Sequence, residues 1–473
     1  MTSTSKAVAE EHGDEDLYRL RPEDVKEPPI GWRQSLRYLG PGLVLSAAVV
    51  GSGELIVTTA LGAEVGFALL WLVVFSTLVK VAVQIELARW AISTGEPALT
   101  GLNKMPPKLG RLGWVNLVWL IGALAKVLQL GGVVGGVVAA CSILLPIAGG
   151  PLSFPSTLIW TIVVVAATVG LQYSTRYSRV ERVAVGLVAL FSLVIVVVAF
   201  GLVPFTPFAY TADEVLGGLS FSVPAGALGV AVAMLGITGI GADEMTNYTY
   251  WCLEKGYARW SGPPDGSQDW QRRAAGWIKV MYKDAFVSWI IYTFGTIAFF
   301  MLGAAVLHPQ GLVPEGNEMI TTLSRTFTDT MGGWASTVFL LGAVIVLGST
   351  MWASTASNPR QYTNFLGVVG LIDWSNARTR LRWIRTFTIA MPIVWGVSYL
   401  FLRSPVLMVQ IGGIAGAVFL MALVVAVWYL RKYETDSRLH GGRAFKVVLL
   451  VSSVAVLLLG VYALLEVFGV SVG

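Results

Sequence analysis

The chain has 473 residues, a formal net charge of +5 and only 13% charged residues, about half the share of soluble domains. Hydrophobic residues make up 55% of the sequence, and 52 glycines come in addition. So few charges cannot cover the surface of two or three soluble domains, which excludes a soluble enzyme, a nucleic-acid-binding protein and a disordered scaffold. Two cysteines and three histidines also give no disulfide framework and no thiolate metal site. The composition predicts an integral membrane protein.

The first 38 residues hold eight acidic side chains and no apolar run, so we expect a solvated tail and not a signal peptide. Eleven apolar stretches follow that are long enough to cross a bilayer, which requires about 20 residues. So many runs with few polar faces argue against buried helices of a soluble core. The predicted spans cover residues 39–62, 66–92, 113–145, 155–171, 179–201, 225–253, 281–307, 333–356, 384–402, 405–430 and 445–468.

The distribution of lysine and arginine predicts the orientation of these spans. If the tail lies in the cytoplasm, 27 of the 33 basic residues lie in the tail and in the loops on its side. Only Arg325 and Arg403 lie in loops on the opposite side. Because cytoplasmic loops carry the basic excess, we expect a multi-pass protein of the plasma (cytoplasmic) membrane with an internal N-terminus and an external C-terminus. The basic excess then faces anionic lipid of the bilayer, and no nucleic acid partner is implied.

Two predicted spans contain glycine clusters in corresponding positions. The first span is interrupted at 51–54, which reads Gly-Ser-Gly-Glu, and the sixth at 236–241, followed at once by an Asp-Glu pair. These spans are the first helices of two five-span units that cross the membrane in opposite directions. Glycine-broken helices in matching positions are typical of transporters with inverted repeats, whose site lies at the midplane. Glycine clusters alone also serve close helix packing, but here an acid accompanies each one.

We therefore expect an all-α integral membrane protein in four parts. A cytoplasmic tail covers 1–38, and a first transmembrane repeat with spans 1 to 5 covers 39–201. A second repeat with spans 6 to 10 covers 225–430, and span 11 with a short outer C-terminus covers 445–473. The oligomeric state is not indicated by the sequence.

Three acidic residues at the breaks are candidate ligands of a transported cation. Glu54 follows the first break, and Asp243 and Glu244 begin the second half of the sixth span, where a helix N-terminus favours negative charge. A carboxylate at mid-bilayer costs about 2.5–3.5 kcal/mol and normally faces a cavity or a partner. In the structural alternative, one acid caps the half-helix and the other pairs with Lys80 or Lys126. Adjacent helical residues point about 100° apart, so which acid of the pair faces the break stays open.

Several polar residues are weaker candidates for a substrate pathway. Ser52 and Thr238 lie within the breaks, and Asn247 lies one turn beyond the first acid of the sixth span. Thr350 and Ser354 lie one turn apart on the eighth span. Polar residues also join membrane helices by hydrogen bonds, and the pattern leaves this alternative open.

A series of short motifs runs from Gly40 to Gly95: a Gly-Pro entry, the break at 51–54, a Gly-Ala turn, a Leu-Leu-Trp and a closing Thr-Gly. In this order the stretch resembles the Nramp family of divalent-metal transporters. The resemblance covers about 60 residues clearly and the remainder by its topology. It implies the LeuT-type fold of five plus five inverted repeats, with helices 1 and 6 broken.

The chain departs from the family pattern at the residues that carry the chemistry. Where the family has Asp-Pro-Gly-Asn, this sequence has Gly-Ser-Gly-Glu, so the ligating aspartate is absent and Glu54 stands in place of the asparagine. The family's Met-Pro-His corresponds to Ile240, Gly241 and Ala242, so the thioether ligand is absent and the sixth span has no histidine for the family's histidine-linked proton pathway. Carboxylate and carbonyl oxygens favour hard cations over soft transition metals.

We therefore expect a secondary transporter and not an enzyme, without a cofactor. Its substrate is a divalent cation, Mg²⁺ or Mn²⁺ in preference to soft metals, moved by alternating access with or without a coupled ion. The predicted oxygen site comprises Glu54, Asp243 or Glu244, and main-chain carbonyls near Gly51 and Gly239.

The alternative is a proton- or sodium-coupled symporter of a small organic solute or anion on the same scaffold. The free amides of the first break would bind an anion, and Glu54 would carry the coupling proton. A non-transporting receptor is a third possibility.

Overall fold

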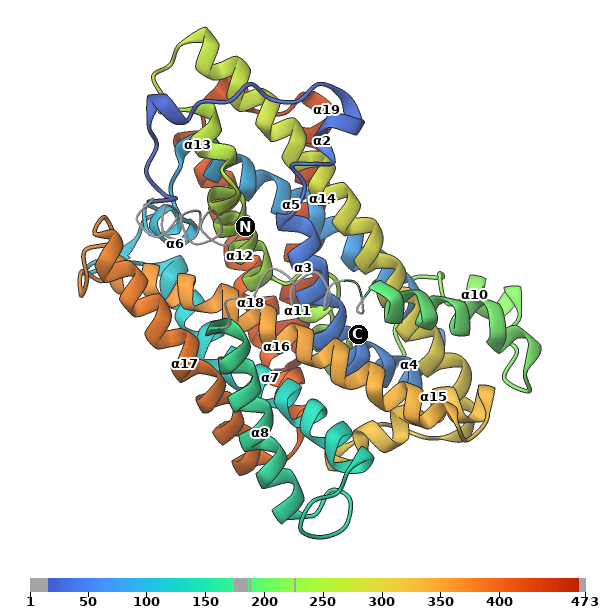
Figure 1. Cartoon of the computed structure of the whole chain (residues 1–473). Helices are drawn as coiled ribbons and strands as arrows, with labels where there is room; N and C mark the ends of the chain where they lie inside the picture. The colour runs from blue at the N-terminus through green and yellow to red at the C-terminus, as the bar shows by residue number, and fades with distance from the viewer. Residues whose placement is uncertain (1–15, 174–185, 187–188, 225–226, 468–473) are drawn as a thin grey trace.

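The computed structural model describes residues 16–173, 186, 189–224 and 227–467, and this part of the chain is almost entirely helical (Figure 1). Within it, eight helices are long and apolar enough to cross a membrane. They agree with eight of the predicted spans. These helices are α5 (Leu70–Thr94), α7 (Trp114–Leu144), α8 (Phe154–Tyr173), α14 (Gln268–Leu302), α16 (Ala335–Val368), α17 (Ala377–Leu402), α18 (Pro405–Tyr433) and α19 (Arg443–Val467).

The first predicted span is a continuous helix and not an interrupted one. It comprises α3 (Pro41–Val49), a wide-turn π-helical segment η2 (Val50–Thr58) and α4 (Thr59–Val65). The backbone N–H of Thr59 donates to the carbonyl of Glu54, five residues earlier. The hydrocarbon region offers no water to hydrogen-bond with the backbone. The wider turns satisfy this requirement, because the N–H and C=O groups of the helix still bond to each other. The glycine cluster therefore widens this helix and does not unwind it, and such turns often mark functional sites.

The sixth predicted span is broken, as the glycine pattern predicts. Helix α11 (Leu228–Ile237) ends before α12 (Ala242–Lys255) begins, and 238–241 between them is unwound. Gly239 has a φ of +64°, in the left-handed region that glycine adopts without strain.

The fifth predicted span, 179–201, and the loop before it lie partly outside the described residues. A shorter apolar helix covers Ala189–Phe205 and ends in η3 (Val198–Leu202) and η4 (Val203–Phe205). The total of eleven spans and the division into two repeats stay predictions.

Two helices extend well beyond the apolar stretches that predicted them. Helix α14 begins within the predicted loop at 254–280, because the Ser267 hydroxyl accepts the N–H of Trp270 at 3.1 Å and caps it. Helix α16 continues through Pro359 to Val368. Hydropathy marks only the part of a helix that faces lipid or core, so polar turns beyond the membrane are missed.

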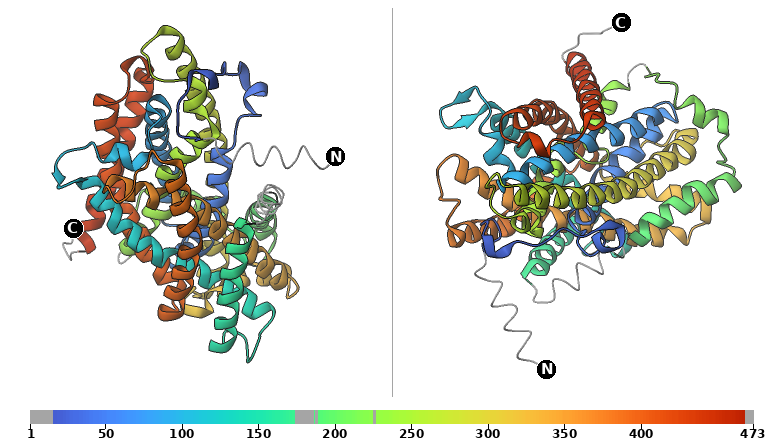
Figure 2. Two further views of the ribbon diagram at one scale, coloured as in Figure 1. Left: turned by 60° about the vertical axis from the view of Figure 1, so that its left-hand side comes forward. Right: turned by 90° about the horizontal axis from the view of Figure 1, so that it is seen from above.

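The core of the molecule is formed around α7 and α18, which pack along each other, with α16 and α17 also against α7 (Figure 2). Close packing depends on glycines of α7. A Cβ atom on Gly132 would lie 2.6 Å from the carbonyl oxygen of Pro405, and one on Gly135 would lie 2.5 Å from the Tyr399 ring. Small residues at such contacts let membrane helices approach closely.

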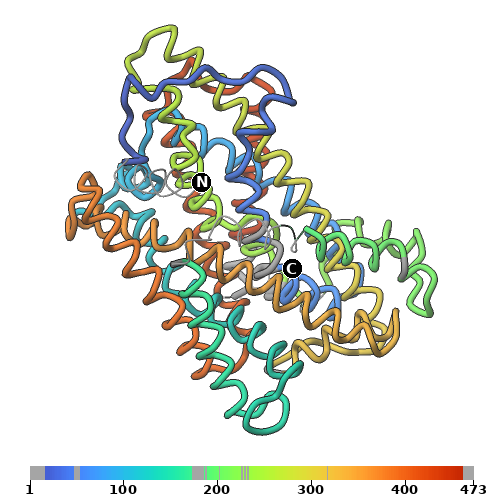
Figure 3. The backbone as a smooth tube through the Cα atoms, viewed as in Figure 1, coloured from blue at the N-terminus to red at the C-terminus, as the bar shows by residue number. Residues whose placement is uncertain are grey.

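The described part of the N-terminal tail is packed against the bundle and is not a free solvated segment. Residues 16–38, here called the tail strap, cross the end of the bundle that holds α13 (Tyr257–Ser261) (Figures 1 and 3). The Lys26 carbonyl accepts the Trp277 indole N–H at 3.0 Å, and the Glu27 carboxylate accepts two bonds from Arg272 at 2.6 and 2.8 Å. The strap thereby ties the tail to the first turns of α14.

The remaining elements are short and lie between the long helices. The β1–β2 hairpin pairs Lys108 with Gly113 in antiparallel register. Amphipathic α15 buries Ile320, Leu323 and Phe327 on one face, a pattern too short for a span. The bounds are η1 (Pro22–Asp24), α2 (Gly31–Ser35), α6 (Ala98–Leu102), β1 (Lys108–Leu109), β2 (Leu112–Gly113), α10 (Ala212–Gly217), η5 (Gly303–Leu307), η6 (His308–Gln310), η7 (Gly316–Glu318), α15 (Met319–Met331) and η8 (Ser437–Leu439).

Candidate functional site

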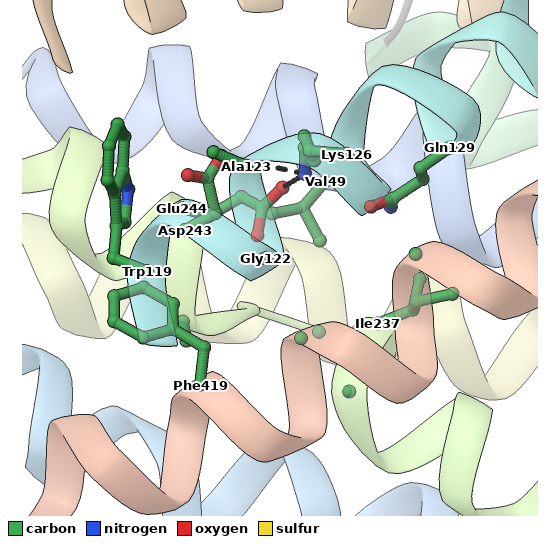
Figure 4. Close-up of a pocket in the computed structure, with 15 residues that line it drawn as sticks. Val49, Trp119, Gly122, Ala123, Lys126, Gln129, Ile237, Asp243, Glu244 and Phe419 are labelled. Carbon is green, nitrogen blue, oxygen red and sulfur yellow. Dashed lines mark hydrogen bonds and ion pairs between the residues drawn. The ribbon is translucent and has the colours of Figure 1, made fainter. Parts of the chain in front are cut away.

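A small cavity lies beside the unwound segment of the sixth span, lined by α7, α11, α12 and α18 (Figure 4). It offers about 20 Å³ to the centres of water-sized molecules, room for about one water or a bare ion. Gly236 brings α11 against α18 at this point, because a Cβ there would lie 1.8 Å from the carbonyl oxygen of Gly413. The close approach of these helices keeps the cavity narrow.

Three charged side chains meet in this cavity. Asp243 and Glu244 come from the first turn of α12, and Lys126 reaches them from α7 (Figure 4). The Lys126 Nζ atom lies 2.5 Å from Glu244 Oε1 and 3.7 Å from Asp243 Oδ2. All three are largely buried, with side-chain exposures of 9%, 19% and 17% for Lys126, Asp243 and Glu244. Both acids line the cavity, and the predicted alternative of a lysine partner is present at the same place.

Amide side chains surround Asp243. The Asn247 amide donates to Asp243 Oδ2 at 3.4 Å and to Asn358 Oδ1 at 3.1 Å. The Gln361 amide donates to the Asp243 carbonyl at 3.1 Å and accepts the indole N–H of Trp119 at 2.7 Å. Asn247 is 5% exposed, and its Oδ1 has no hydrogen-bond partner among the residues that the structure describes. An unused oxygen therefore lies one turn from the acid pair.

Glu54 lies on the other side of the unwound segment and is fully buried. Its Oε1 accepts the N–H of Gly239 at 2.7 Å, and its Oε2 accepts the Thr58 hydroxyl at 2.8 Å. The Lys80 ammonium donates to the carbonyl of Thr238 at 2.7 Å. Glu54 and Lys80 thus bond to the N–H and the C=O of one peptide group, between Thr238 and Gly239, which the break leaves without helical partners. Glu54 is not among the described residues lining the cavity.

The other predicted residues are brought together only in part. Gly239 lines the cavity together with the acid pair. Gly51 and Ser52 lie in η2, whose turns are helical. Thr350 and Ser354 are buried in α16, and neither belongs to the described lining.

The cavity also contains residues that the sequence pattern did not single out. Trp119, Gln129 and Phe419 line it, and Lys126 was considered only as a partner of an acid. A charged residue within a span is itself a sign of a functional site, and Gln129 lies on the same helix face, three residues later. The charge of Lys126 within a span and the position of Gln129 on the same face of α7 could therefore have indicated both residues.

Among the described residues, no group of three or more His, Cys, Asp and Glu side chains is placed to hold a metal ion. A cation in this cavity would meet two carboxylates, and its other ligands would be main-chain carbonyls and waters. Mg²⁺ is commonly bound in this way, through one or two carboxylates and several retained waters.

The model of the family described as natural resistance-associated macrophage protein-like, Nramp, matches residues 42–466. The chain belongs to the Nramp family. Members of this family are membrane transporters, which confirms the prediction that the chain is not an enzyme.

Individual Nramp relatives are similar at low identity. The "Metal transporter Nramp2" of Oryza sativa subsp. japonica is 32% identical over 102 residues, which is 21% of this chain and only 20% of the rice protein. The "Divalent metal cation transporter MntH" of Mycobacterium tuberculosis is 26% identical over 341 residues, 71% of each chain. The match to the rice relative therefore spans about a fifth of its length.

Solved structures confirm the predicted fold class. A mutant of the Eremococcus coleocola manganese transporter superposes with a TM-score of 0.65 at 15% identity, over 95% of this chain and 92% of that one. Mhp1, a nucleobase-cation-symport-1 family transporter, superposes with a TM-score of 0.53 at 15% identity, over 96% of both chains. At these identities the likeness concerns the LeuT-type fold alone.

Proposed function

We propose that this Nramp family member is a secondary transporter that moves a divalent metal cation by alternating access through the cavity beside the sixth-span break. The observation that carries the proposal is the Asp243–Glu244 pair, two carboxylates in an ion-sized cavity at the start of a half-helix. Unwound backbone with acids at this depth is typical of transporter ion sites. The rice and mycobacterial relatives are both named as metal transporters, which supports the same substrate class.

We further propose that hard ions such as Mg²⁺ and Mn²⁺ are preferred. None of the described residues that line the cavity is a methionine, cysteine or histidine, and soft metals bind best to sulfur. The proposed ligands are Asp243, Glu244, the main chain near Gly239 and water. A contribution of Glu54 and of the Gly51 carbonyl to cation binding stays a prediction. Glu54 would first have to release the N–H of Gly239.

We propose the membrane orientation that the distribution of basic residues predicts. The N-terminus is cytoplasmic, the C-terminus is external and the protein lies in the plasma membrane, with spans 1 to 5 and 6 to 10 forming the two inverted repeats. Coupling to a proton or sodium ion is compatible with this arrangement.

A second candidate function is the coupled symport of a small organic solute or anion. Lys126 favours it, because an ammonium group in the cavity suits a substrate carboxylate. The size of the cavity argues the other way, since about 20 Å³ does not admit an amino acid in this conformation.

An isotope-uptake panel in proteoliposomes tests the proposal. We expect saturable uptake of Mn²⁺ and Mg²⁺ by the wild-type protein, and its loss in an Asp243→Asn, Glu244→Gln double variant. Liposomes without protein give the background. Uptake of an amino acid or organic anion in the absence of any metal uptake would contradict the proposal and favour the symporter.

A further inference from the structure

The proposed cation site already contains a positively charged side chain of the protein, Lys126, and the proposed function does not explain its presence. Lys126 is the one basic side chain among the described residues that line the cavity, and it is buried. Its ammonium lies 2.5 Å from Glu244 Oε1 and 3.7 Å from Asp243 Oδ2, so it is within ion-pair distance of both proposed ligands of the cargo (Figure 4). A buried ammonium requires such partners, because an unpaired buried charge is strongly destabilising.

The ammonium and a metal ion cannot both use these oxygens fully. Glu244 Oε1 either accepts an N–H of Lys126 or ligates a metal ion. A bound divalent ion would also face the positive charge of Lys126 at close range. Two carboxylates and one ammonium leave a local charge of −1. Two carboxylates alone give −2, which matches a divalent cation.

The side chain is built to leave this position. Lysine carries a compact point charge on a flexible four-carbon stem and makes no fixed bidentate geometry. Arginine in the same place would bind the carboxylates through a rigid planar fork. The choice of lysine therefore gives the acid pair a partner that a more highly charged ion can replace.

We propose that Lys126 is a tethered cation that fills the Asp243–Glu244 site when no cargo is bound and is displaced by a divalent ion. It thereby sets both affinity and selectivity, because a monovalent ion gains too little from two carboxylates to displace an ammonium. This inference rests on the proposed function and adds a specificity-determining residue to it.

Calorimetric titration of the purified full-length protein with Mg²⁺ tests the inference. Lys126→Met removes the charge and keeps an unbranched side chain whose thioether does not attract Mg²⁺. We expect its Mg²⁺ affinity to rise about tenfold and its discrimination against Na⁺ to fall. Lys126→Arg should lower Mg²⁺ affinity about tenfold, because the fork is harder to displace. Lys104→Met is the control. The Lys104 ammonium lies 2.7 Å from a carboxylate oxygen of Glu96 and of Glu434, and Lys104 is not among the described residues that line the cavity.

The outcomes separate the inference from the proposed function. A merely structural lysine predicts weaker binding in both Lys126 variants, so opposite changes support the tethered cation. Equal or weaker Mg²⁺ binding by a folded Lys126→Met protein, with the wild type binding normally, would overturn it. If Lys126→Met fails to fold, unchanged or tighter binding by Lys126→Arg overturns it instead. Absence of Mg²⁺ and Mn²⁺ binding in every variant would contradict the proposed function as well.

Discussion

Glu54 and Lys80 bond to the two sides of one peptide group, the Gly239 N–H and the Thr238 C=O, in the unwound segment between α11 and α12. An unpaired peptide group at this depth costs about 1–3 kcal/mol, and an unpaired buried charge costs more. The two side chains therefore stabilise a backbone conformation that helical bonding cannot. Glu54 therefore positions the break, while Asp243 and Glu244 across it are the proposed ligands of the cargo.

Substitution of Glu54 tests this positioning role. Glu54→Ala leaves the Gly239 N–H without its acceptor, and we expect destabilisation of about 3 kcal/mol, seen as a lower melting temperature in detergent. Glu54→Gln keeps an acceptor for that N–H, and the Thr58 hydroxyl can accept from the new amide, so stability should largely remain. A loss of Mg²⁺ affinity in Glu54→Gln as large as in Asp243→Asn would show instead that Glu54 is a ligand.

The residue at the position of the family's methionine gives a test of selectivity. Ile240 is fully buried between Gly239 and Ala242, both of which line the cavity. Ile240→Met adds a thioether three residues before Asp243 in the chain, so Cd²⁺ should compete more strongly with Mn²⁺ uptake than in the wild type if this residue faces the site. An unchanged Cd²⁺ competition in a folded variant would count against the residue-by-residue match to the family in this span.

At the scale of elements, glycines decide how closely the helices around the cavity approach. Gly236→Ala would place its Cβ 1.8 Å from the Gly413 carbonyl oxygen, so α11 and α18 must separate. We expect destabilisation of about 1–3 kcal/mol from overpacking, together with weaker cation binding because the cavity walls move. Gly348→Ala in α16 is the matched control, since nothing lies within 4 Å of its added carbon. Equal melting temperatures for the two variants would contradict the packing argument.

The tail strap is an element whose contacts lie far from the cavity. A Cβ on Gly276 of α14 would lie 2.2 Å from the Pro28 ring, so Gly276→Leu should displace the strap. We expect faster tryptic cleavage after Lys26 and unchanged Mg²⁺ affinity. Gly217→Leu serves as the control, because Gly217 has open space around it. Unaltered cleavage would mean that the strap tolerates the clash and is held by other contacts.

At the scale of the whole molecule, charge asymmetry predicts the orientation. A cysteine replacing Glu315, in a predicted external loop, should react with an impermeant thiol reagent on intact cells. A cysteine replacing Pro264, in a predicted cytoplasmic loop, should react only after lysis. Cys252 is buried and Cys141 is half-buried, so the wild-type protein gives the background. The reverse labelling pattern would overturn the orientation.

The sequence predicts most of the fold because apolar length is a strong signal. α5, α7 and α18 agree with their predicted spans within a few residues. The break at 236–241 was also predictable, since a glycine cluster is followed there at once by two adjacent acids. The helical conformation of residues 51–54, within η2, was not predictable, because a glycine cluster permits a wide helical turn and an unwound segment equally.

The candidate site was predictable only in part. Asp243 and Glu244 were found because acids within spans are rare, but their contact with Lys126 depends on the arrangement of α7 and α12 around the cavity. Likewise, the bond from Gly239 to Glu54 joins residues 185 positions apart, and no local pattern predicts which polar group will satisfy a distant peptide.

The central claim is that a divalent cation binds between Asp243 and Glu244. Calorimetric titration of Mn²⁺ into the wild type, Asp243→Asn, Glu244→Gln and a control Glu27→Gln variant tests it most directly. Each single variant keeps one acid to pair with Lys126, so the charge of the cluster changes from −1 to neutral and folding should persist. We predict that the wild type and the control bind Mn²⁺ alike, and that each cavity variant binds at least about tenfold more weakly. Unchanged Mn²⁺ affinity in both folded cavity variants would contradict the account.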